Sequence, residues 1–190
     1  MRKIILALTL LAPTAAFAHP GHGETSHFMA GLAHPLSGLD HITVMVAVGL
    51  LAALKGGRAV WLWPLSFVAA MLAGGALGMA QVPLPLVEPA ILASIVVLGL
   101  LLALAIDLPV GLGAALLGAF ALFHGHAHGT EATADGAMGY MAGFAIMTAA
   151  LHLAGIGAGM ALRSVSLKPV VRIAGAACVL IGVALSLQLV

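Results

Sequence analysis

The stretch from His34 to Met45, which reads HPLSGLDHITVM, stands at the head of an apolar run that carries no charge from Ile42 to Leu54. It holds two imidazoles, a carboxylate and a thioether, all of which are metal ligands in proteins. Ionisable side chains that lead into a membrane span are costly to bury, and they therefore mark a functional site by default.

The spacing of these donors predicts their geometry. Proline fits the first turn of a helix, so a helix is predicted to begin near His34. At about 100° per residue, His34, His41 and Met45 then fall on one stripe roughly 40° wide. The two histidines lie roughly 10 Å apart along the axis, too far to share an ion held at about 2.0–2.1 Å. His41 and Met45 are close enough to do so, and an unbroken helix thus predicts successive binding stations.

Ser37-Gly38 offers another geometry, because a break there would fold His34 down towards His41. Asp40 points about 100° away from His41 on a helix, and we expect it to orient a ligand on another helix. In a purely structural interpretation, the proline only starts a helix and the carboxylate only pairs with one histidine.

The composition is that of an integral membrane protein. The chain has 190 residues, of which 63% are hydrophobic and 7% charged, and its mean hydropathy is +1.20. Soluble domains are about 25% charged. The fold class is predicted to be an all-α, polytopic bundle of transmembrane helices in the lipid bilayer. A net charge of +1 gives no indication of nucleic acid, and the single cysteine excludes an intrachain disulfide.

Residues 1–18 have the pattern of a secretory signal peptide, with Arg2-Lys3 before an apolar core and Ala16-Phe17-Ala18 as the cleavage site. An uncleaved first helix is the alternative. After cleavage, residues 19–34 form a periplasmic, histidine-rich tail, and residues 35–190 form the transmembrane domain. Six apolar spans near the required length of about 20 residues are predicted at 35–54, 60–80, 87–106, 109–125, 137–162 and 170–189.

The basic residues agree with this topology. With residue 19 outside, the links after odd-numbered spans lie in the cytoplasm. All the basic residues then fall on the cytoplasmic side, as the positive-inside rule requires: Arg2, Lys3, Lys55, Arg58, Arg163, Lys168 and Arg172. The mature N-terminus and the C-terminus are both predicted to be periplasmic, in a bacterial inner membrane.

Most histidines gather on the predicted outer side, and none lies on a cytoplasmic link. His124, His126 and His128 alternate with small residues at the outer end of the fourth span, and Glu131 follows. Such a tract is a compositional indication of metal binding, with a metal-free surface loop as the alternative. A cleaved N-terminus would add the amine and ring of His19, with His22 nearby, as a weak collector of ions.

His152 lies well inside the fifth span, among small apolar residues. A lone histidine in a helix is often structural, but a second ligand-rich helix is available here. We therefore predict a line of ligands from His41 to His152, with Met45 as a soft donor.

The spacing His34-Pro35-x-Ser37-Gly38-x-Asp40-His41-x-x-x-Met45 resembles the signature of the HupE/UreJ family of small nickel/cobalt permeases. The similarity extends over nearly the whole mature chain and includes the leader, the FHGHAHG stretch at 123–129 and the helix of His152. It implies uptake of nickel or cobalt in support of hydrogenase or urease maturation. It also implies that His34, Asp40 and His41 are the essential ligands of transport.

The predicted function is therefore a permease rather than an enzyme, with a transported nickel or cobalt ion and no tightly bound cofactor. No phosphate-binding loop is present, so the chain does not use ATP itself. Two alternatives stay open: an intramembrane zinc hydrolase, and a metal sensor or assembly factor that transports nothing. The sequence also leaves open whether the protein is a homo-oligomer.

Overall fold

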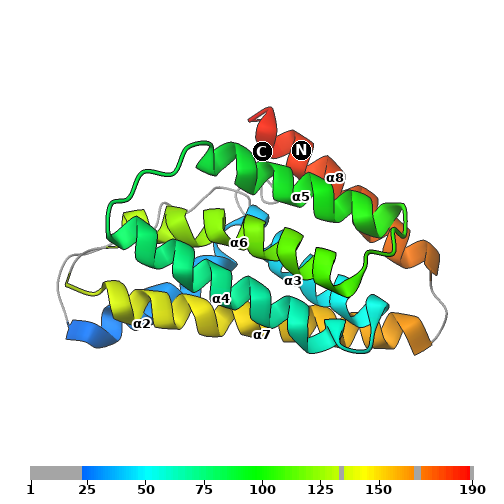
Figure 1. Ribbon diagram of the computed structural model, residues 1–190, viewed down its shortest axis with the longest axis horizontal. Coiled ribbons are helices and arrows are strands. Elements are labelled where there is room, and N and C mark those ends of the chain that lie inside the picture. The colour runs from blue at the N-terminus through cyan, green and yellow to red at the C-terminus, as the bar shows by residue number, and fades with distance from the viewer. Residues whose placement is uncertain (1–22, 133–134, 165–167, 189–190) are drawn as a thin grey trace, which may run out of the picture.

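The computed structural model describes residues 23–132, 135–164 and 168–188. The predicted signal peptide, His19 and His22 lie outside these ranges. The described residues form long helices joined by short links (Figure 1). In chain order these are α2 (Gly23–Ala33), the 3-10 turn η2 (His34–Leu36), α3 (Leu39–Lys55), α4 (Ala59–Met79), α5 (Val87–Ala103), α6 (Val110–Glu131), α7 (Ala137–Ser164) and α8 (Lys168–Ser186). The prediction of an all-helical protein is confirmed.

Length and hydropathy qualify α4, α6, α7 and α8 as membrane spans, and α2 with α3 forms a fifth, sharply bent candidate. At 17 residues, α5 is shorter. Two helix bounds differ from the predicted spans. The part of the predicted tail from residue 23 onward is helical, as α2. The fourth span continues to Glu131, so the tract of alternating histidines is part of α6.

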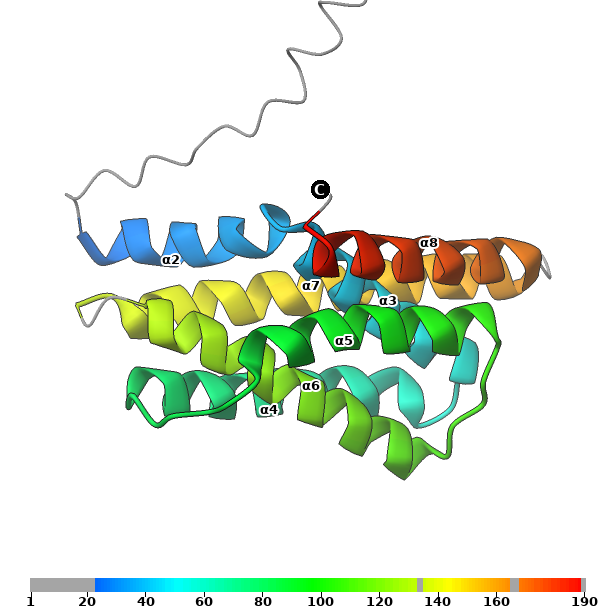
Figure 2. The same ribbon diagram turned by 90° about the horizontal axis from the view of Figure 1, so that it is seen from above.

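The helices associate in pairs. α4 packs along α6, α5 along α8, and the segment α2–α3 along the whole of α7 (Figure 2). Close approach depends on glycine. A Cβ on Gly125 of α6 would collide with the carbonyl oxygen of Met71 on α4, and a Cβ on Gly49 of α3 would collide with the carbonyl oxygen of His152 on α7. Small residues at such seams let membrane helices pack backbone to backbone.

Polar contacts tie the links to the two ends of the bundle. At the end that holds the α3–α4 link, the Nζ atom of Lys55 lies 2.6 Å from Oδ1 of Asp107, just after α5. At the opposite end, Nε2 of His126 lies 2.7 Å from the carbonyl oxygen of Val82 in the α4–α5 link. Between them lies an apolar core that includes Val44, Met45, Phe67, Ile95, Leu98 and Phe144. This packing fixes the helix ends that carry the histidines.

Candidate metal centre

A break between α2 and α3 brings His34 and His41 together. The chain passes through η2, the hydroxyl of Ser37 donates a hydrogen bond of 2.7 Å to the carbonyl of His34, and Gly38 is extended before α3 begins. The two helices meet at 78°, and the rings of His34 and His41 lie edge to face, 5.8 Å between centroids. Of the two geometries open from the sequence, the broken helix is the one observed. Broken spans are where transporter folds build their binding sites.

Asp40 holds the ring of its neighbour. Its Oδ1 atom lies 2.9 Å from Nδ1 of His41, whose side chain is 8% exposed. We expected Asp40 to serve a ligand on another helix, but the first turn of α3 turns the carboxylate onto His41 itself. A carboxylate at Nδ1 takes the N–H of the neutral imidazole and leaves the lone pair on Nε2. His41 thus presents a lone pair to the interior.

α6 places a second imidazole directly opposite. The Nε2 atom of His128 lies 2.6 Å from the Nε2 atom of His41. The ring centroids of His128 and His34 are 4.6 Å apart. Phe144 of α7 covers the group, with its ring centroid 4.4 Å from that of His128. Three imidazoles, from η2, α3 and α6, therefore converge beside the ring of Phe144.

Glu131 stands at the outer edge of this group. Its Oε2 atom lies 3.5 Å from Nδ1 of His128, and its side chain is 65% exposed. One donor atom each from His34, His128 and Glu131 lie within 4.8 Å of one another, an arrangement that fits a metal ion. His34 and Glu131 also border a cavity of about 250 Å³, whose other lining residues are His27, Ala132 and Tyr140.

His27 and Tyr140 were not among the sequence candidates. The position of His27 depends on α2, which places it against Gly136 before α7 begins. Tyr140 lies in the first turn of α7, 5.8 Å from the ring of His34. The chain has only one tyrosine, and its position at the outer start of a largely apolar span was the signal that could have identified it.

His124 lies one turn further in on α6, fully buried, with its ring centroid 5.4 Å from that of His41. Its Nε2 atom is 3.1 Å from the hydroxyl of Ser94 on α5. That hydroxyl already donates to the carbonyl of Ile91, at 2.6 Å. The imidazole therefore donates from Nε2, and its buried Nδ1, which has no hydrogen-bond partner in the described part of the chain, carries the lone pair.

His152 is separated from this group by an aromatic ring. Phe67 of α4 lies between them, with its centroid 6.0 Å from that of His124 and 5.1 Å from that of His152. His152 is buried, and among the described residues neither of its ring nitrogens has a hydrogen-bond partner. The rings of His124 and Phe67 thus connect the surroundings of His41 to those of His152, and the phenyl ring offers no metal donor. Met45 is buried in the apolar core one turn below His41.

His126 is not part of the cluster. Residues two apart on a helix point about 200° away from each other, so the face that carries His124 and His128 excludes the residue between them. The ring of His126 turns to the α4–α5 link and meets the carbonyl of Val82. The tract of alternating histidines therefore has two roles. His124 and His128 face the cluster, and His126 holds the α4–α5 link.

The charges of the cluster suit a divalent cation. With neutral imidazoles, Asp40 and Glu131 give it a formal charge of −2, which a divalent ion cancels. An unpaired charge is expensive inside a membrane protein. The arrangement can thus hold a dehydrated divalent ion without leaving net charge, using nitrogen and oxygen donors that suit nickel, cobalt and zinc.

Comparison with known proteins identifies the family. A model of the family described as "HupE / UreJ protein" matches residues 6–185. The chain is also 46% identical to "Protein HupE" of Rhizobium leguminosarum bv. viciae over 186 residues, which cover 96% of each chain. The chain belongs to the HupE/UreJ family. No solved structure matches this HupE/UreJ protein. Its apolar helices and its family together make it a multi-pass membrane protein.

Proposed function

We propose that the protein is a permease that imports nickel or cobalt ions across the bacterial inner membrane. One observation supports this above all: the Nε2 atoms of His41 and His128 face each other at 2.6 Å. A carboxylate stands behind each ring, Asp40 firmly and Glu131 more loosely. Asp40 leaves the lone pair of His41 on Nε2, so His128 can donate a hydrogen bond to it from its own Nε2, and a cation would take the place of this proton between the two nitrogens.

The cluster needs only a small adjustment to hold such an ion. Two imidazole nitrogens at about 2.0–2.1 Å from one ion lie roughly 3 Å apart. The rings of His41 and His128 would therefore separate by a few tenths of an ångström. His34 and Glu131 supply further donors on the outer side. Oxygen and imidazole donors bind nickel and cobalt without the permanence of a thiolate site, as a transport site that must release its ion requires.

The proposed path runs inward along the histidines. The outer cavity and the histidine-rich tail collect the ion, and His34, Glu131 and His128 accept it. It then passes to His41 and Asp40, on to His124, and past Phe67 to His152. Phe67 has no lone pair, so it must move aside for passage. The basic residues at the opposite end support an orientation with the cluster facing the periplasm.

The membrane potential supplies enough driving force. A divalent ion moving inward gains about 4.6 kcal/mol at 100 mV, which supports accumulation of roughly three orders of magnitude. The proposal includes six spans, with α5 as a short one. It also includes a cleaved signal peptide and a link to hydrogenase or urease maturation. The spans and the signal peptide rest on the sequence pattern, and the link to maturation rests on the resemblance of the chain to the HupE/UreJ family.

Uptake by vesicles that contain only this protein tests the proposal. We expect accumulation of nickel or cobalt that depends on an inside-negative potential and is lost in His128→Gln. Zinc is included as a competitor, to rank the metals. Absence of uptake by correctly folded protein would overturn the proposal and favour a sensor or assembly factor. One tightly retained zinc ion per chain after purification, without uptake, would favour the hydrolase instead.

A further inference from the structure

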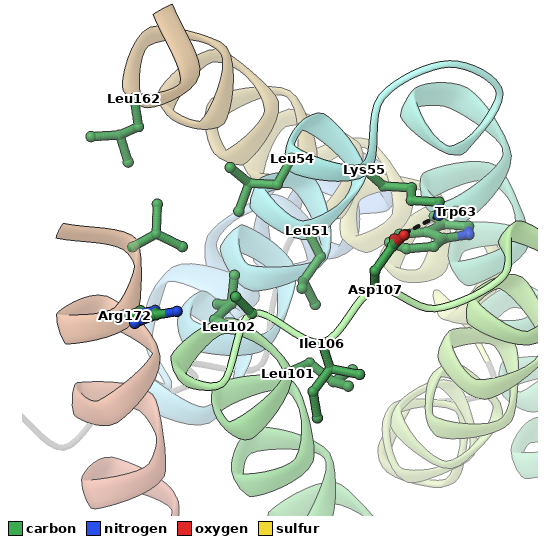
Figure 3. A pocket seen from close by; sticks show the side chains of 12 residues that line it. Leu51, Leu54, Lys55, Trp63, Leu101, Leu102, Ile106, Asp107, Leu162 and Arg172 are labelled. Atoms are coloured by element: carbon green, nitrogen blue, oxygen red, sulfur yellow. Dashed lines mark hydrogen bonds and ion pairs between the residues drawn. The ribbon is translucent and has the colours of Figure 1, made fainter. Parts of the chain in front are cut away.

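The inner ends of α3, α5, α7 and α8 enclose a cavity of about 510 Å³ that the proposed ion path does not use (Figure 3). This volume is within the range of about 300–1,000 Å³ that is usual for ligand pockets. Its wall is mostly apolar and includes Leu51, Leu54, Leu101, Leu102, Leu162 and Val171. A small polar ligand would leave this wall unused, so the occupant must carry a substantial apolar part.

The rim of the cavity is basic. Lys55 and Asp107 form an ion pair of 2.6 Å and cancel each other. Arg172 of α8 also lines the cavity, and Figure 3 shows its guanidinium extending from α8 towards Leu102. Within the described ranges, Arg172 pairs with no carboxylate. The rim thus has a net charge of +1, which repels a transition-metal cation and attracts an anion.

The cavity lies where α7 and α8 have little contact with each other. α8 packs chiefly on α5 and makes few contacts with α7, yet Leu162 of α7 and Arg172 of α8 both line the cavity. In the proposed membrane arrangement, an acyl chain could enter the cavity between these two helices. By the proposed topology this end lies at the cytoplasmic leaflet, where basic pockets between helices bind anionic lipid headgroups.

We propose that this cavity binds an anionic glycerophospholipid, with one acyl chain along the leucines and the phosphate on Arg172. A guanidinium can donate two parallel hydrogen bonds to a phosphate. The leucines of α3, α5 and α7 surround the acyl chain in place of the neighbouring lipids of the bilayer. The bound lipid fills the space that α8 leaves beside α7, and it thereby holds α8 in place.

The chain provides its own reporter. Trp63 lines the cavity and is 3% exposed, whereas the other tryptophan, Trp61, is 51% exposed. The indole N–H of Trp63 donates to the carbonyl of Val110 at 2.8 Å, which fixes the ring. A Trp61→Phe variant leaves Trp63 as the sole tryptophan. Bromine on an acyl chain quenches an indole only at close range, so the fluorescence of Trp63 reports an occupied cavity.

The test uses the full-length Trp61→Phe protein in zwitterionic nanodiscs that contain a fixed fraction of brominated phosphatidylglycerol or brominated phosphatidylcholine. We expect about fivefold higher apparent affinity for the anionic lipid, the effect of one basic residue near the headgroups. Adding Arg172→Gln should abolish this preference, and Arg172→Lys should retain most of it. Arg58→Gln, at an exposed position outside the cavity lining, should leave it unchanged.

Equal quenching by the two lipids would overturn the proposal, as would a preference that survives Arg172→Gln. A preference lost equally in Arg58→Gln would also overturn it, since the attraction would then come from the surface charge alone. Both leaflets of the nanodisc hold the same lipids. The result therefore depends neither on the orientation of the protein nor on ion transport.

Discussion

The Nε2 atoms of His41 and His128 lie 2.6 Å apart, although 87 positions separate the two residues in the chain. His41 is held by the first turn of α3 and His128 by the last turn of α6. Each ring is backed by the carboxylate of a close neighbour in sequence, Asp40 and Glu131. The pair joins two local units, each of a histidine and a carboxylate, into one site.

Replacing His41 tests this site most directly. His41→Gln keeps the approximate volume and the capacity for hydrogen bonding but removes the imidazole lone pair. We expect uptake to fall to the level of empty vesicles, with normal abundance in the membrane. His41→Ala should also abolish uptake, because the imidazole is lost. Its abundance should stay normal, because the change leaves only a small cavity beside Phe144. Uptake and membrane abundance are measured together. Near-normal uptake by His41→Gln would remove His41 from the path.

His128 and His126 form a matched pair on α6. His128→Gln should abolish uptake, because its ring faces His41. His126→Gln should leave uptake per molecule within about twofold of wild type, because an amide can still donate to the carbonyl of Val82 and a neutral hydrogen bond contributes only about 1 kcal/mol. Initial rates normalised to abundance check this. Equal loss in both variants would mean that the whole tract binds ions.

The two carboxylates should behave differently. Asp40 is 28% exposed and directly holds His41, so Asp40→Asn should lower metal affinity by about 10–100-fold, the usual cost of removing a carboxylate behind a ligand histidine. Glu131 is 65% exposed and more loosely placed. Glu131→Gln should raise the ion concentration needed for half-maximal uptake and leave the maximal rate nearly intact. Concentration curves for both variants decide the matter.

Acid should weaken uptake at limiting metal. A histidine of the predicted outer tail must be neutral to collect an ion, and the reference pKa of a histidine side chain is about 6.5. Between about pH 7.5 and 5.5 the neutral fraction of one such group falls about tenfold. We expect uptake from limiting nickel to fall accordingly, and saturating nickel to restore it, because protons and metal compete. A flat profile would indicate collection by carboxylates. The measurement varies only the external pH, at constant potential.

Gly125 should be indispensable to the α4–α6 seam. A methyl group there collides with the backbone of Met71, and overpacking of this kind costs about 1–3 kcal/mol. Gly125→Ala should lower the melting temperature in detergent and the membrane abundance. Gly157→Ala, where a Cβ meets nothing within 4 Å, should be neutral or slightly stabilising. Equal effects of the two changes would contradict the close packing.

The positions of the long helices could be predicted because hydropathy and short polar links mark them. α3, α4 and α7 begin and end within a few residues of the expected spans. The site was harder. The spacing of His34 and His41 admitted two geometries, and only the packing of α2 on α7 distinguishes them. Asp40 was expected to act on another helix, because the prediction considered only the angle of about 100° between neighbouring residues. It did not consider that a side chain in the first turn can bend back to the ring of the next residue.

The two faces of α6 that carry the histidines could not be predicted, because the fourth span was expected to end too early. With the fourth span predicted to end at residue 125, the tract beyond it had no helical face to separate His126 from its neighbours. In the structure α6 continues to Glu131, and the helical repeat alone then divides the tract. The partner of His128 could not be predicted, because it depends on the contact of α6 with α3, far apart in sequence.

The unequal lengths of α5 and α7 have a consequence for the surrounding bilayer. α5 has 17 residues and α7 has 28, or about 25 Å and 42 Å of helix, whereas the hydrocarbon core is about 30 Å thick. One helix is too short for the membrane and the other too long. In the proposed six-span topology, the lipid thins beside α5, while α7 tilts or extends beyond the hydrocarbon core. The mismatch between helix length and bilayer thickness therefore differs around the protein. Longer acyl chains would increase the mismatch at α5 and decrease it at α7.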